Sequence, residues 1–316
     1  MEGLFNQVMT QLSVVVPVYN ESSLIHELIK RVSLNVKKIT ENYEIIIVND
    51  GSTDSTWSLI AEQAKFDKNL KALDFSRNFG HHYAITAGLV ESAGDWVVVM
   101  DGDLQDRPEV IPDLFNKAQE GYDVVFVSRQ NRKENIFYRL SQRFFYILLR
   151  ILSGVNFDSK QANFSIISRK VVNAFKDFPE TARFYGSTIH WLGFNRTTIF
   201  AEHGQRHSGK PSYTLKKRFK LAGDIIISFS ERPLRASIYL GSAISLISIL
   251  FAFWLIISNF YWGYSVIGWP SLMVSIFFLG GVILTILGIM GVYIGRIFQE
   301  VKNRPLFVIS NKINFK

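Results

Sequence analysis

The chain of 316 residues contains no cysteine. Disulfide bonds, cysteine-ligated zinc and thiol catalysis are therefore excluded. The sequence also lacks a G-x-G-x-x-G pattern after its first predicted strand and a G-x-x-x-x-G-K-S/T phosphate loop, which argues against a dinucleotide oxidoreductase and a P-loop NTPase. Residues 1–11 have neither a basic stretch nor a long apolar core, so we expect no cleaved signal peptide and a cytoplasmic N-terminal part.

Charge is missing from one long stretch, since residues 236–295 include no Asp, Glu, Lys, Arg or His. Within it, Ala236–Ser258 and Ser271–Gly295 are each long enough to cross the hydrocarbon core of a bilayer as a helix. Aromatic residues lie between these two segments, and basic residues flank their outer ends. The positive-inside rule then predicts a transmembrane hairpin with both ends in the cytoplasm. The alternative is a buried pair of helices in a soluble protein.

Two further segments predict amphipathic helices at the membrane surface. Leu215–Phe229 follows a basic stretch and is expected to lie at the interface between the bilayer and water. The aromatic-rich segment Ile136–Leu152 is either a second interfacial helix or a helix that packs on the core. Small residues in the second predicted span, such as Gly288 and Gly291, allow close helix packing within the hairpin or between the subunits of a homo-oligomer.

The first 200 residues alternate between short β-branched runs and helical stretches. Strands are predicted at Val14–Tyr19, Glu44–Asp50, Lys71–Ser76, Trp96–Asp103 and Asp123–Arg129. Helices are predicted between them, at roughly Ser22–Ile39, Asp54–Phe66, Gly80–Ala93 and Pro108–Glu120. This alternation predicts an α/β sandwich with a mostly parallel sheet.

Acidic residues follow three of the predicted strands, where ligands bind in an open α/β sheet. Glu21 follows the first strand, Asp50 ends the second, and Asp101 and Asp103 end the fourth. Residues i and i+2 of an extended strand point the same way, so the last two carboxylates can share Mg²⁺ or Mn²⁺. Solvated turn carboxylates are the alternative. Three acidic strand ends at one edge indicate a polar ligand accompanied by a cation.

Four motifs occur in order, namely VVVPVYNE (14–21), VNDGSTDST (48–56), FSRNFGHHYAITAG (75–88) and VMDGDLQDRPE (99–109). They resemble the family 2 glycosyltransferases of GT-A fold. The likeness extends through Arg183-Phe184 and Gly209-Lys210 to the C-terminal segment GVYIGRIFQEVKNRP (291–305). This layout resembles bacterial polyisoprenyl-phosphate glycosyltransferases, which are relatives of dolichol-phosphate mannose synthase.

The resemblance implies a role for each matching position. It implies that Asp101 lies beside the nucleotide and that Asp103 is the main ligand of Mg²⁺ or Mn²⁺. Gln105 is expected to line the donor site. The nucleoside would be held by Pro17, Tyr19, Glu21 and Asp50. Phosphate beside the membrane would be bound by Arg206, Lys210 and, as a weaker candidate, Arg183.

The chain departs from these relatives at Asn163. Relatives often have Gly-Asp-Phe where this chain has Ala162-Asn163-Phe164, and the aspartate is their proposed catalytic base. An amide cannot take up a proton at pH 7, but a phosphate monoester has a second pKa near 6 and is already mostly ionised. Asn163 therefore fits a lipid-phosphate acceptor, which it can orient by hydrogen bonds. His81 and His82 begin a predicted helix without zinc-ligand spacing, which favours helix-start or donor-pocket residues.

These features predict an inverting, metal-dependent glycosyltransferase in a multi-pass protein of the bacterial inner membrane. Its partners would be a nucleotide-sugar of the UDP type, undecaprenyl phosphate and the lipid bilayer, with no nucleic acid, and its product would serve envelope or O-antigen modification. A transferase with a hydroxyl or lipid-linked-sugar acceptor and a non-catalytic membrane scaffold are the alternatives. The expected divisions are a cytoplasmic catalytic domain (1–205), a basic linker with an interfacial helix (206–235), two transmembrane helices (236–295) and a cytoplasmic tail (296–316).

Overall fold

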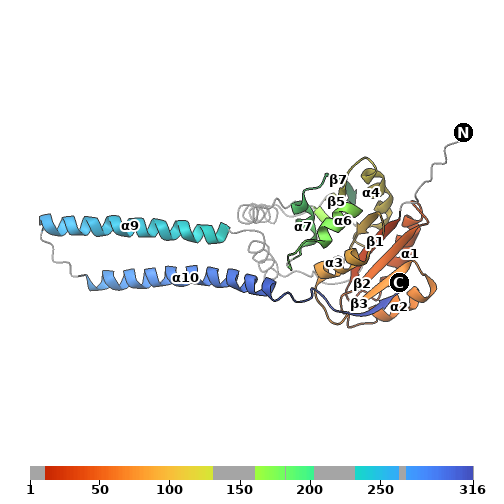
Figure 1. Cartoon of the computed structure of the whole chain (residues 1–316), viewed down its shortest axis with the longest axis horizontal. Helices are drawn as coiled ribbons and strands as arrows, with labels where there is room; N and C mark the ends of the chain where they lie inside the picture. The colour runs from red at the N-terminus through yellow and green to blue at the C-terminus, as the bar shows by residue number, and fades with distance from the viewer. Residues whose placement is uncertain (1–10, 131–160, 182, 203–231, 263–267, 316) are drawn as a thin grey trace. The chain divides into compact units, whose positions relative to one another are not determined.

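The computed structural model describes residues 11–130, 161–181, 183–202, 232–262 and 268–315 (Figure 1). The described residues fall into two compact units. The first contains those before residue 131, those of 161–202 and those from 305 onward. The second contains 232–262 and 268–304. The predicted segments Ile136–Leu152 and Leu215–Phe229 lie outside the described residues, as do Arg206 and Lys210.

A sheet of eight strands forms the centre of the first unit, counted over the described residues, in the order β7-β5-β6-β4-β1-β2-β3-β8. The strands are β1 (Leu12–Val18), β2 (Tyr43–Asn49), β3 (Leu70–Phe75), β4 (Trp96–Val99), β5 (Val124–Gln130), β6 (Gln161–Ser168), β7 (Arg196–Glu202) and β8 (Ile309–Ile313). Strands β4, β1, β2 and β3 run parallel, as does β7 beside β5. Strand β6 is antiparallel to β4 and β5, and β8 is antiparallel to β3. The sheet predicted to be mostly parallel is therefore mixed.

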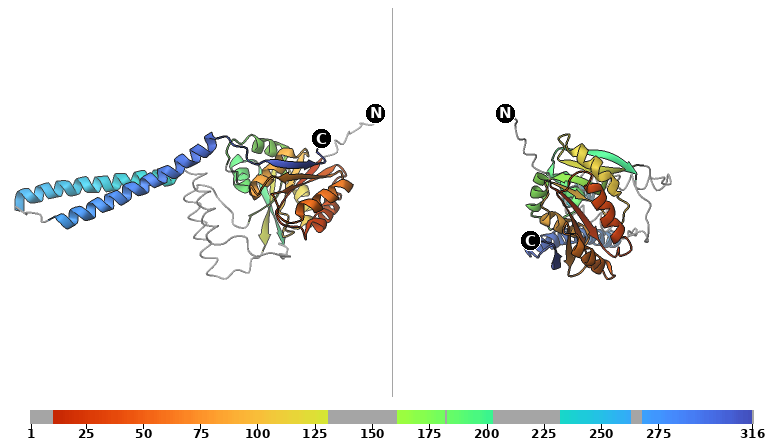
Figure 2. Two further views of the ribbon diagram at one scale, coloured as in Figure 1. Left: turned by 90° about the horizontal axis from the view of Figure 1, so that it is seen from below. Right: turned by 90° about the vertical axis from the view of Figure 1, so that its right-hand side faces the viewer.

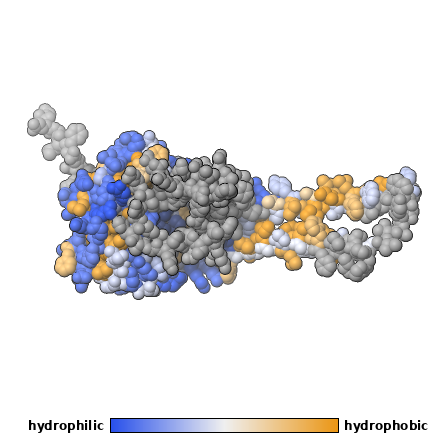
Figure 3. Space-filling model, turned by 180° about the vertical axis from the view of Figure 1, so that it is seen from behind, coloured by the Kyte–Doolittle hydropathy of each residue, from blue (hydrophilic) through white to orange (hydrophobic). Residues whose placement is uncertain are grey.

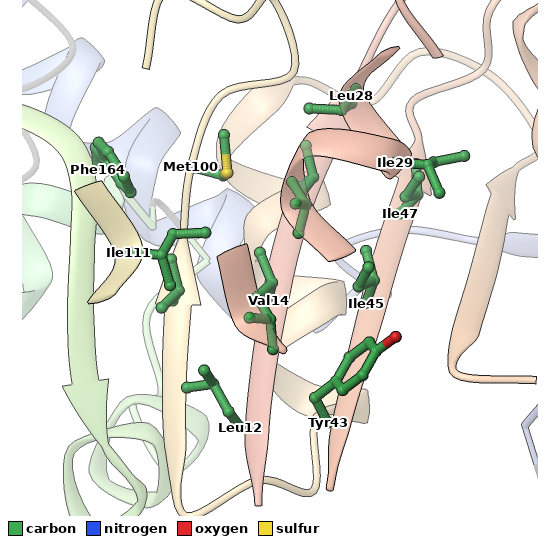
Figure 4. Packing of buried hydrophobic residues seen from close by; sticks show 14 of the residues in the cluster. Leu12, Val14, Leu28, Ile29, Tyr43, Ile45, Ile47, Met100, Ile111 and Phe164 are labelled. Atoms are coloured by element: carbon green, nitrogen blue, oxygen red, sulfur yellow. The ribbon is translucent and has the colours of Figure 1, made fainter. Parts of the chain in front are cut away.

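Helices cover both faces of this sheet, because successive residues of each strand point to opposite faces. Val14 and Val16 of β1 join the core that contains the buried sides of α1 (Ile25–Val36), α2 (Thr56–Phe66) and α4 (Ile111–Ala118), seen in Figure 4. Val15 joins the opposite core, with α3 (His81–Glu91), α6 (Arg169–Lys176) and α7 (Tyr185–Leu192). A short 3₁₀ helix, η1 (Pro108–Val110), precedes α4. Burial on both faces explains why the strands consist of almost unbroken apolar runs.

The C-terminal segment returns to the first unit and completes the edge of its sheet (Figure 2). Strand β8 pairs with β3, and the side-chain amide of Asn314 donates to three backbone carbonyls, those of Ala64, Asp67 and Leu70. Lys312 forms an ion pair with Glu91 at 2.6 Å. The sequence analysis assigned residues 296–316 to a cytoplasmic tail outside the catalytic domain. The structure instead assigns the last part of that range to the catalytic sheet.

Two long helices make up the described part of the second unit, α9 (Arg232–Trp262) and α10 (Trp269–Val301). They contain the two predicted spans. Among the described residues one stretch, Phe278–Val301, is long and apolar enough to cross a membrane, with a mean hydropathy of 2.1. Leu234–Ser248 in α9 is a shorter apolar stretch. Many apolar side chains of both helices are exposed, which the orange surface in Figure 3 shows.

Candidate active site

The loops that follow β1 and β2 are bound to each other at the carboxyl edge of the sheet. The backbone N–H of Asn20 donates to the Ser52 hydroxyl at 2.9 Å, and the Asn20 side-chain oxygen accepts the N–H of Thr53 at 2.8 Å. The N–H of Glu21 donates to the Thr56 hydroxyl at 3.0 Å. Asn20 adopts a φ of 55°, which asparagine tolerates better than most residues. The first two motifs therefore form one connected ligand edge.

Pro17 and Tyr19, both predicted to hold the nucleoside, lie at this edge. Pro17 belongs to β1 and is paired with Val48 of β2. The Tyr19 ring follows the strand and keeps 45% of its surface exposed. A Cβ added to Gly102 would lie 3.0 Å from the carbonyl oxygen of Pro17, so the turn that carries Asp101 and Asp103 packs against the end of β1.

The carboxylate of Asp50 is almost fully buried and binds backbone. Its Oδ1 accepts the N–H of Phe79 at 2.8 Å, and both of its oxygens accept the N–H of Gly80, at 3.1 and 3.0 Å. Burial raises the pKa of Asp50 above its ordinary value, although these backbone hydrogen bonds oppose the shift. Asp50 thus holds the turn before α3. Its predicted contact with the nucleoside stays a prediction.

The segment that carries Asp101 and Asp103 is a turn, which corrects the predicted strand. Strand β4 was expected to reach Asp103 but ends at Val99, and Leu104 has a φ of 60°. The backbone N–H of Asp101 donates to Oδ2 of Asp106 at 3.1 Å, and Oδ1 of Asp103 accepts the N–H of Gln105 at 3.0 Å. The side-chain alternation of an extended strand therefore does not explain how the carboxylates of Asp101 and Asp103 are positioned. The buried Asp106, which the sequence analysis did not single out, closes this turn.

Asp101 and Asn163 both lie beside His81. The Nε2 atom of His81 lies 3.2 Å from Oδ1 of Asp101 and 3.2 Å from the side-chain nitrogen of Asn163. Burial lowers the pKa of His81. The charge and hydrogen bond of Asp101, together with the charges of Asp50 and Asp106, raise this pKa by more than burial lowers it, so it lies above the ordinary value. The structure therefore brings together residues from the loop after β4, from β6 and from the start of α3.

A buried chain of hydrogen bonds leads from the backbone of Asn163 through Ser165 and Tyr185 to His82. The Ser165 hydroxyl donates to the backbone oxygen of Asn163 at 2.8 Å and also lies 2.8 Å from the Tyr185 hydroxyl. The N–H of Tyr185 donates to Nδ1 of His82 at 3.4 Å, and burial, together with the neighbouring His81, lowers the pKa of His82 to about 3. His82 is therefore neutral at pH 7. Ser165 is fully buried, and its hydroxyl is engaged within the fold.

Arg183, which was predicted to contact phosphate, forms hydrogen bonds to the backbone of its own domain. Its guanidinium donates to the backbone carbonyls of four residues near the end of α6: Phe175, Lys176, Phe178 and Glu180. Burial lowers the pKa of the guanidinium, although a charged group still satisfies the last carbonyls of a helix well. These contacts give Arg183 a structural role. The phosphate contacts of Arg206 and Lys210 lie outside the described residues.

The described residues contain no group of three or more His, Asp or Glu side chains arranged to hold a metal ion. The turn after β4 nevertheless contributes two carboxylates, those of Asp101 and Asp103, which are ligands that Mg²⁺ and Mn²⁺ accept. A hard divalent ion with two protein ligands keeps open coordination positions, which the oxygens of a bound diphosphate can fill. The residues present therefore fit a metal that binds together with a nucleotide.

A mixed α/β sheet with acidic turns at the carboxyl edge of its parallel centre is a GT-A-like arrangement. Residues 13–175 match the family model described as glycosyl transferase family 2, and the chain belongs to this family of enzymes. The glycosyltransferase YkcC of Bacillus subtilis is 39% identical over 301 residues, covering 95% of this chain and 93% of that protein.

Two further relatives match the chain along nearly all of both lengths. The SfII prophage-derived bactoprenol glucosyl transferase of Shigella flexneri is 39% identical, covering 95% of this chain and 97% of the relative. The prophage bactoprenol glucosyl transferase homolog of Escherichia coli K12 is 36% identical, with 95% and 98% covered. Among solved structures, glucosyl-3-phosphoglycerate synthase from Mycobacterium tuberculosis is similar with a TM-score of 0.49 and 21% identity, over 69% of this chain and 76% of that one.

Proposed function

We propose that this enzyme transfers a sugar from a nucleotide-sugar of the UDP type to a polyprenyl phosphate, with inversion at the anomeric carbon. The relatives named bactoprenol glucosyl transferases support this acceptor, because they match the chain over 95% of its length, including both long helices. The observation that carries the proposal is the carboxamide of Asn163 beside His81 and Asp101. A site without a carboxylate base at this position suits an acceptor that arrives ionised.

The acceptor chemistry follows from the second pKa of a phosphate monoester, which lies near 6. At pH 7 a phosphate oxygen of the lipid attacks the anomeric carbon from the face opposite the diphosphate. The bond between that carbon and the diphosphate oxygen breaks, and its electron pair leaves with the nucleoside diphosphate. No proton has to be removed, so the enzyme's task is to position both partners and exclude water.

Residues of the chain divide this task between donor and acceptor. The linked loops at Asn20 and Ser52, with the exposed Tyr19 ring, form the surface on which we place the nucleoside. Asp103 and Asp101 would hold Mg²⁺ or Mn²⁺, and when bound the ion neutralises negative charge on the departing diphosphate. The side chain of Asn163 would hydrogen-bond an oxygen of the acceptor phosphate or of the sugar.

The connectivity of the chain supports a membrane hairpin. Strand β7 before the long helices and strand β8 after them belong to one folded unit, so any crossings of a bilayer by the segment between them must be even in number. Because α10 contains a stretch that can span, α9 would supply the return crossing. Basic residues stand at the outer ends of both helices, which favours a catalytic domain in the cytoplasm. We therefore place the reaction at the cytoplasmic face of a bacterial inner membrane.

The experiment is a transfer assay with the full chain in lipid nanodiscs, undecaprenyl phosphate and a panel of nucleotide-sugars, with Mg²⁺ or Mn²⁺ supplied. We expect one lipid-linked sugar, with an anomeric configuration opposite to that of the donor when measured by NMR. No lipid-linked product across the panel would contradict the proposal. Transfer to a hydroxyl acceptor alone would support a different acceptor class, and metal-dependent nucleotide binding without turnover would support a scaffold.

A further inference from the structure

His81 occupies a fixed position between the two sides of the proposed site. It is the first residue of α3 and follows Gly80, whose N–H is bound by the buried carboxylate of Asp50. Its Nε2 atom faces Asp101 and Asn163 at 3.2 Å each. Asp101 belongs to the turn that would hold the metal, whereas Asn163 lies where relatives often have a carboxylate. A single ring nitrogen therefore contacts both sides.

The hydrogen-bonding partners decide where the ring carries a proton. Oδ1 of Asp101 is a carboxylate oxygen, which only accepts, and it lies 3.2 Å from Nε2 of His81. A ring nitrogen without hydrogen would put two acceptors in contact at this distance, so the geometry favours a hydrogen on Nε2. The terminal atom of Asn163 that faces this N–H must then be an acceptor. Rotating the carboxamide by 180° places its oxygen there, because its oxygen and nitrogen are nearly equal in size. Its NH₂ group is then directed away from the imidazole.

The side chain of Asn163 is half-buried, and the outer end of its carboxamide lies near Gly186 of α7. A Cβ added to Gly186 would meet one atom within 4 Å, Oδ1 of Asn163 at 3.9 Å, and rotation of the carboxamide puts the NH₂ group in this place. No side chain at position 186 therefore covers this atom. The amide NH₂ can donate to an oxygen of a bound molecule on this side, which a carboxylate at the same position cannot do.

We propose that His81 is a positioning residue that orients the Asn163 carboxamide so that its NH₂ group binds an anionic oxygen of the acceptor phosphate. The same ring nitrogen faces Oδ1 of Asp101 and so links the acceptor side to the turn whose carboxylates would hold the metal. This inference rests on the proposed function and deepens it by assigning the acceptor-phosphate contact to the pair His81 and Asn163.

The first test compares His81→Ala and His81→Gln with wild type in the nanodisc transfer assay. Loss of the ring lets the Asn163 amide rotate, so His81→Ala should lower kcat/KM for undecaprenyl phosphate by about tenfold or more, since small misplacements in a site are costly. The side-chain NH₂ of glutamine can replace Nε2–H, so His81→Gln should recover most of the loss. His26→Ala, at an exposed position on α1, is the matched control and should equal wild type.

The second test is a double-mutant cycle between His81→Ala and Asn163→Ala, measured as kcat/KM for the acceptor and as binding of UDP with Mn²⁺. If the two residues act as one unit, the double variant should lose no more than the more damaged single variant. Multiplying losses would overturn the inference. So would a His81→Ala enzyme within twofold of wild type, or a folded His81→Gln enzyme as poor as His81→Ala.

These outcomes separate the inference from the proposed function. If wild type makes no lipid-linked sugar, the proposed function fails. If wild type is active and the cycle shows no coupling, the function stands and the positioning role of His81 fails. Melting temperatures of all variants would be compared with wild type, and UDP binding would show that the donor side is intact.

Discussion

Phe307 stacks on Phe75, with ring centroids 5.1 Å apart and an angle of 12° between the rings. Phe75 ends β3 and also meets Phe79 edge to face at 5.6 Å. The backbone N–H of Phe79 is bound by Asp50, and the N–H of Ser76 donates to the carbonyl of Val308 at 3.0 Å. The segment that follows α10 is therefore packed against the turn that leads into the active site. This relationship fixes the start of the C-terminal segment to the catalytic sheet within the first unit.

Replacing Phe307 should destabilise the catalytic domain. Phe307→Ala removes a half-buried ring from a stacked pair, and we expect a cost of about 2 kcal/mol. The measurement is the thermal unfolding of the catalytic domain in the full chain, followed by near-UV circular dichroism. Val308→Ala changes an exposed side chain and keeps the backbone bond to Ser76, so its melting temperature should stay close to that of wild type. Equal melting temperatures for both variants would refute the packing role of Phe307.

Gly51 should not tolerate a side chain. Its φ is 65°, and an added Cβ would lie 2.3 Å from the carbonyl carbon of Arg77, which is backbone and cannot move aside cheaply. We expect Gly51→Ala to cost about 3 kcal/mol or more, and to weaken UDP binding because the turn before α3 is displaced. Gly121→Ala is the control, since Gly121 also has a positive φ, of 100°, but no atom lies within 4 Å of its added Cβ. Its cost should be about 1–2 kcal/mol, from the backbone conformation alone. Similar losses in the two variants would contradict the steric explanation.

Asp103 should be essential for metal-dependent transfer. Asp103→Ala removes a carboxylate from the turn that would hold Mg²⁺ or Mn²⁺, and we expect transfer to fall by about a hundredfold or more. Chelation with EDTA should produce a similar loss in wild type, and added Mn²⁺ should reverse it. Asp113→Ala, at an exposed position of α4, should leave transfer unchanged. An Asp103→Ala enzyme with wild-type activity would remove Asp103 from the metal site.

Glu44 should make stability depend on pH in acid. Burial raises its pKa, but hydrogen bonds from the N–H of Ala93, the ammonium of Lys71 and the hydroxyl of Ser13 lower it more, so the pKa lies below the ordinary 4.5. A depressed pKa stabilises the fold above about pH 4.5, and that stabilisation disappears as the pH falls through the folded-state pKa. The melting temperature of wild type should therefore drop more steeply below pH 4.5 than that of Glu44→Gln. Exposed Glu41→Gln should follow the wild-type curve. Parallel curves for all three proteins would argue against this role.

The sequence predicted the central strands well because their signal is local. The apolar runs of β1, β2 and β3 were located to within two residues, since strands buried on both faces must be apolar at nearly every position. The predicted end of β4 was wrong by four residues, as Met100 continues the apolar run while Asp101 to Gln105 turn away. The carboxylate of Asp106, five residues after Asp101, closes this turn, and nothing in the apolar run itself indicates that contact.

Roles assigned from motifs depended on contacts that a sequence does not specify. Asp50 and Arg183 were assigned to ligands, and the structure shows both bound to backbone: Asp50 to the N–H groups of Phe79 and Gly80, and Arg183 to carbonyls three to eight residues before it. Strand β8 is short and polar, with exposed residues at its centre, so no hydrophobic pattern predicted that it would join the sheet. Its place follows from the open edge of β3, whose backbone groups need partners.

The amino-acid sequence by itself determined the alternation of strands and helices, the acidic residues at the strand ends, the charge-free stretch and the family. It did so because burial and turn chemistry act over a few residues at a time. Only the tertiary structure decided that β6 lies beside β4, which brings Asn163 to His81 and Asp101. Strand order depends on contacts between segments far apart in the chain, and Asn163 and His81 themselves are 82 positions apart.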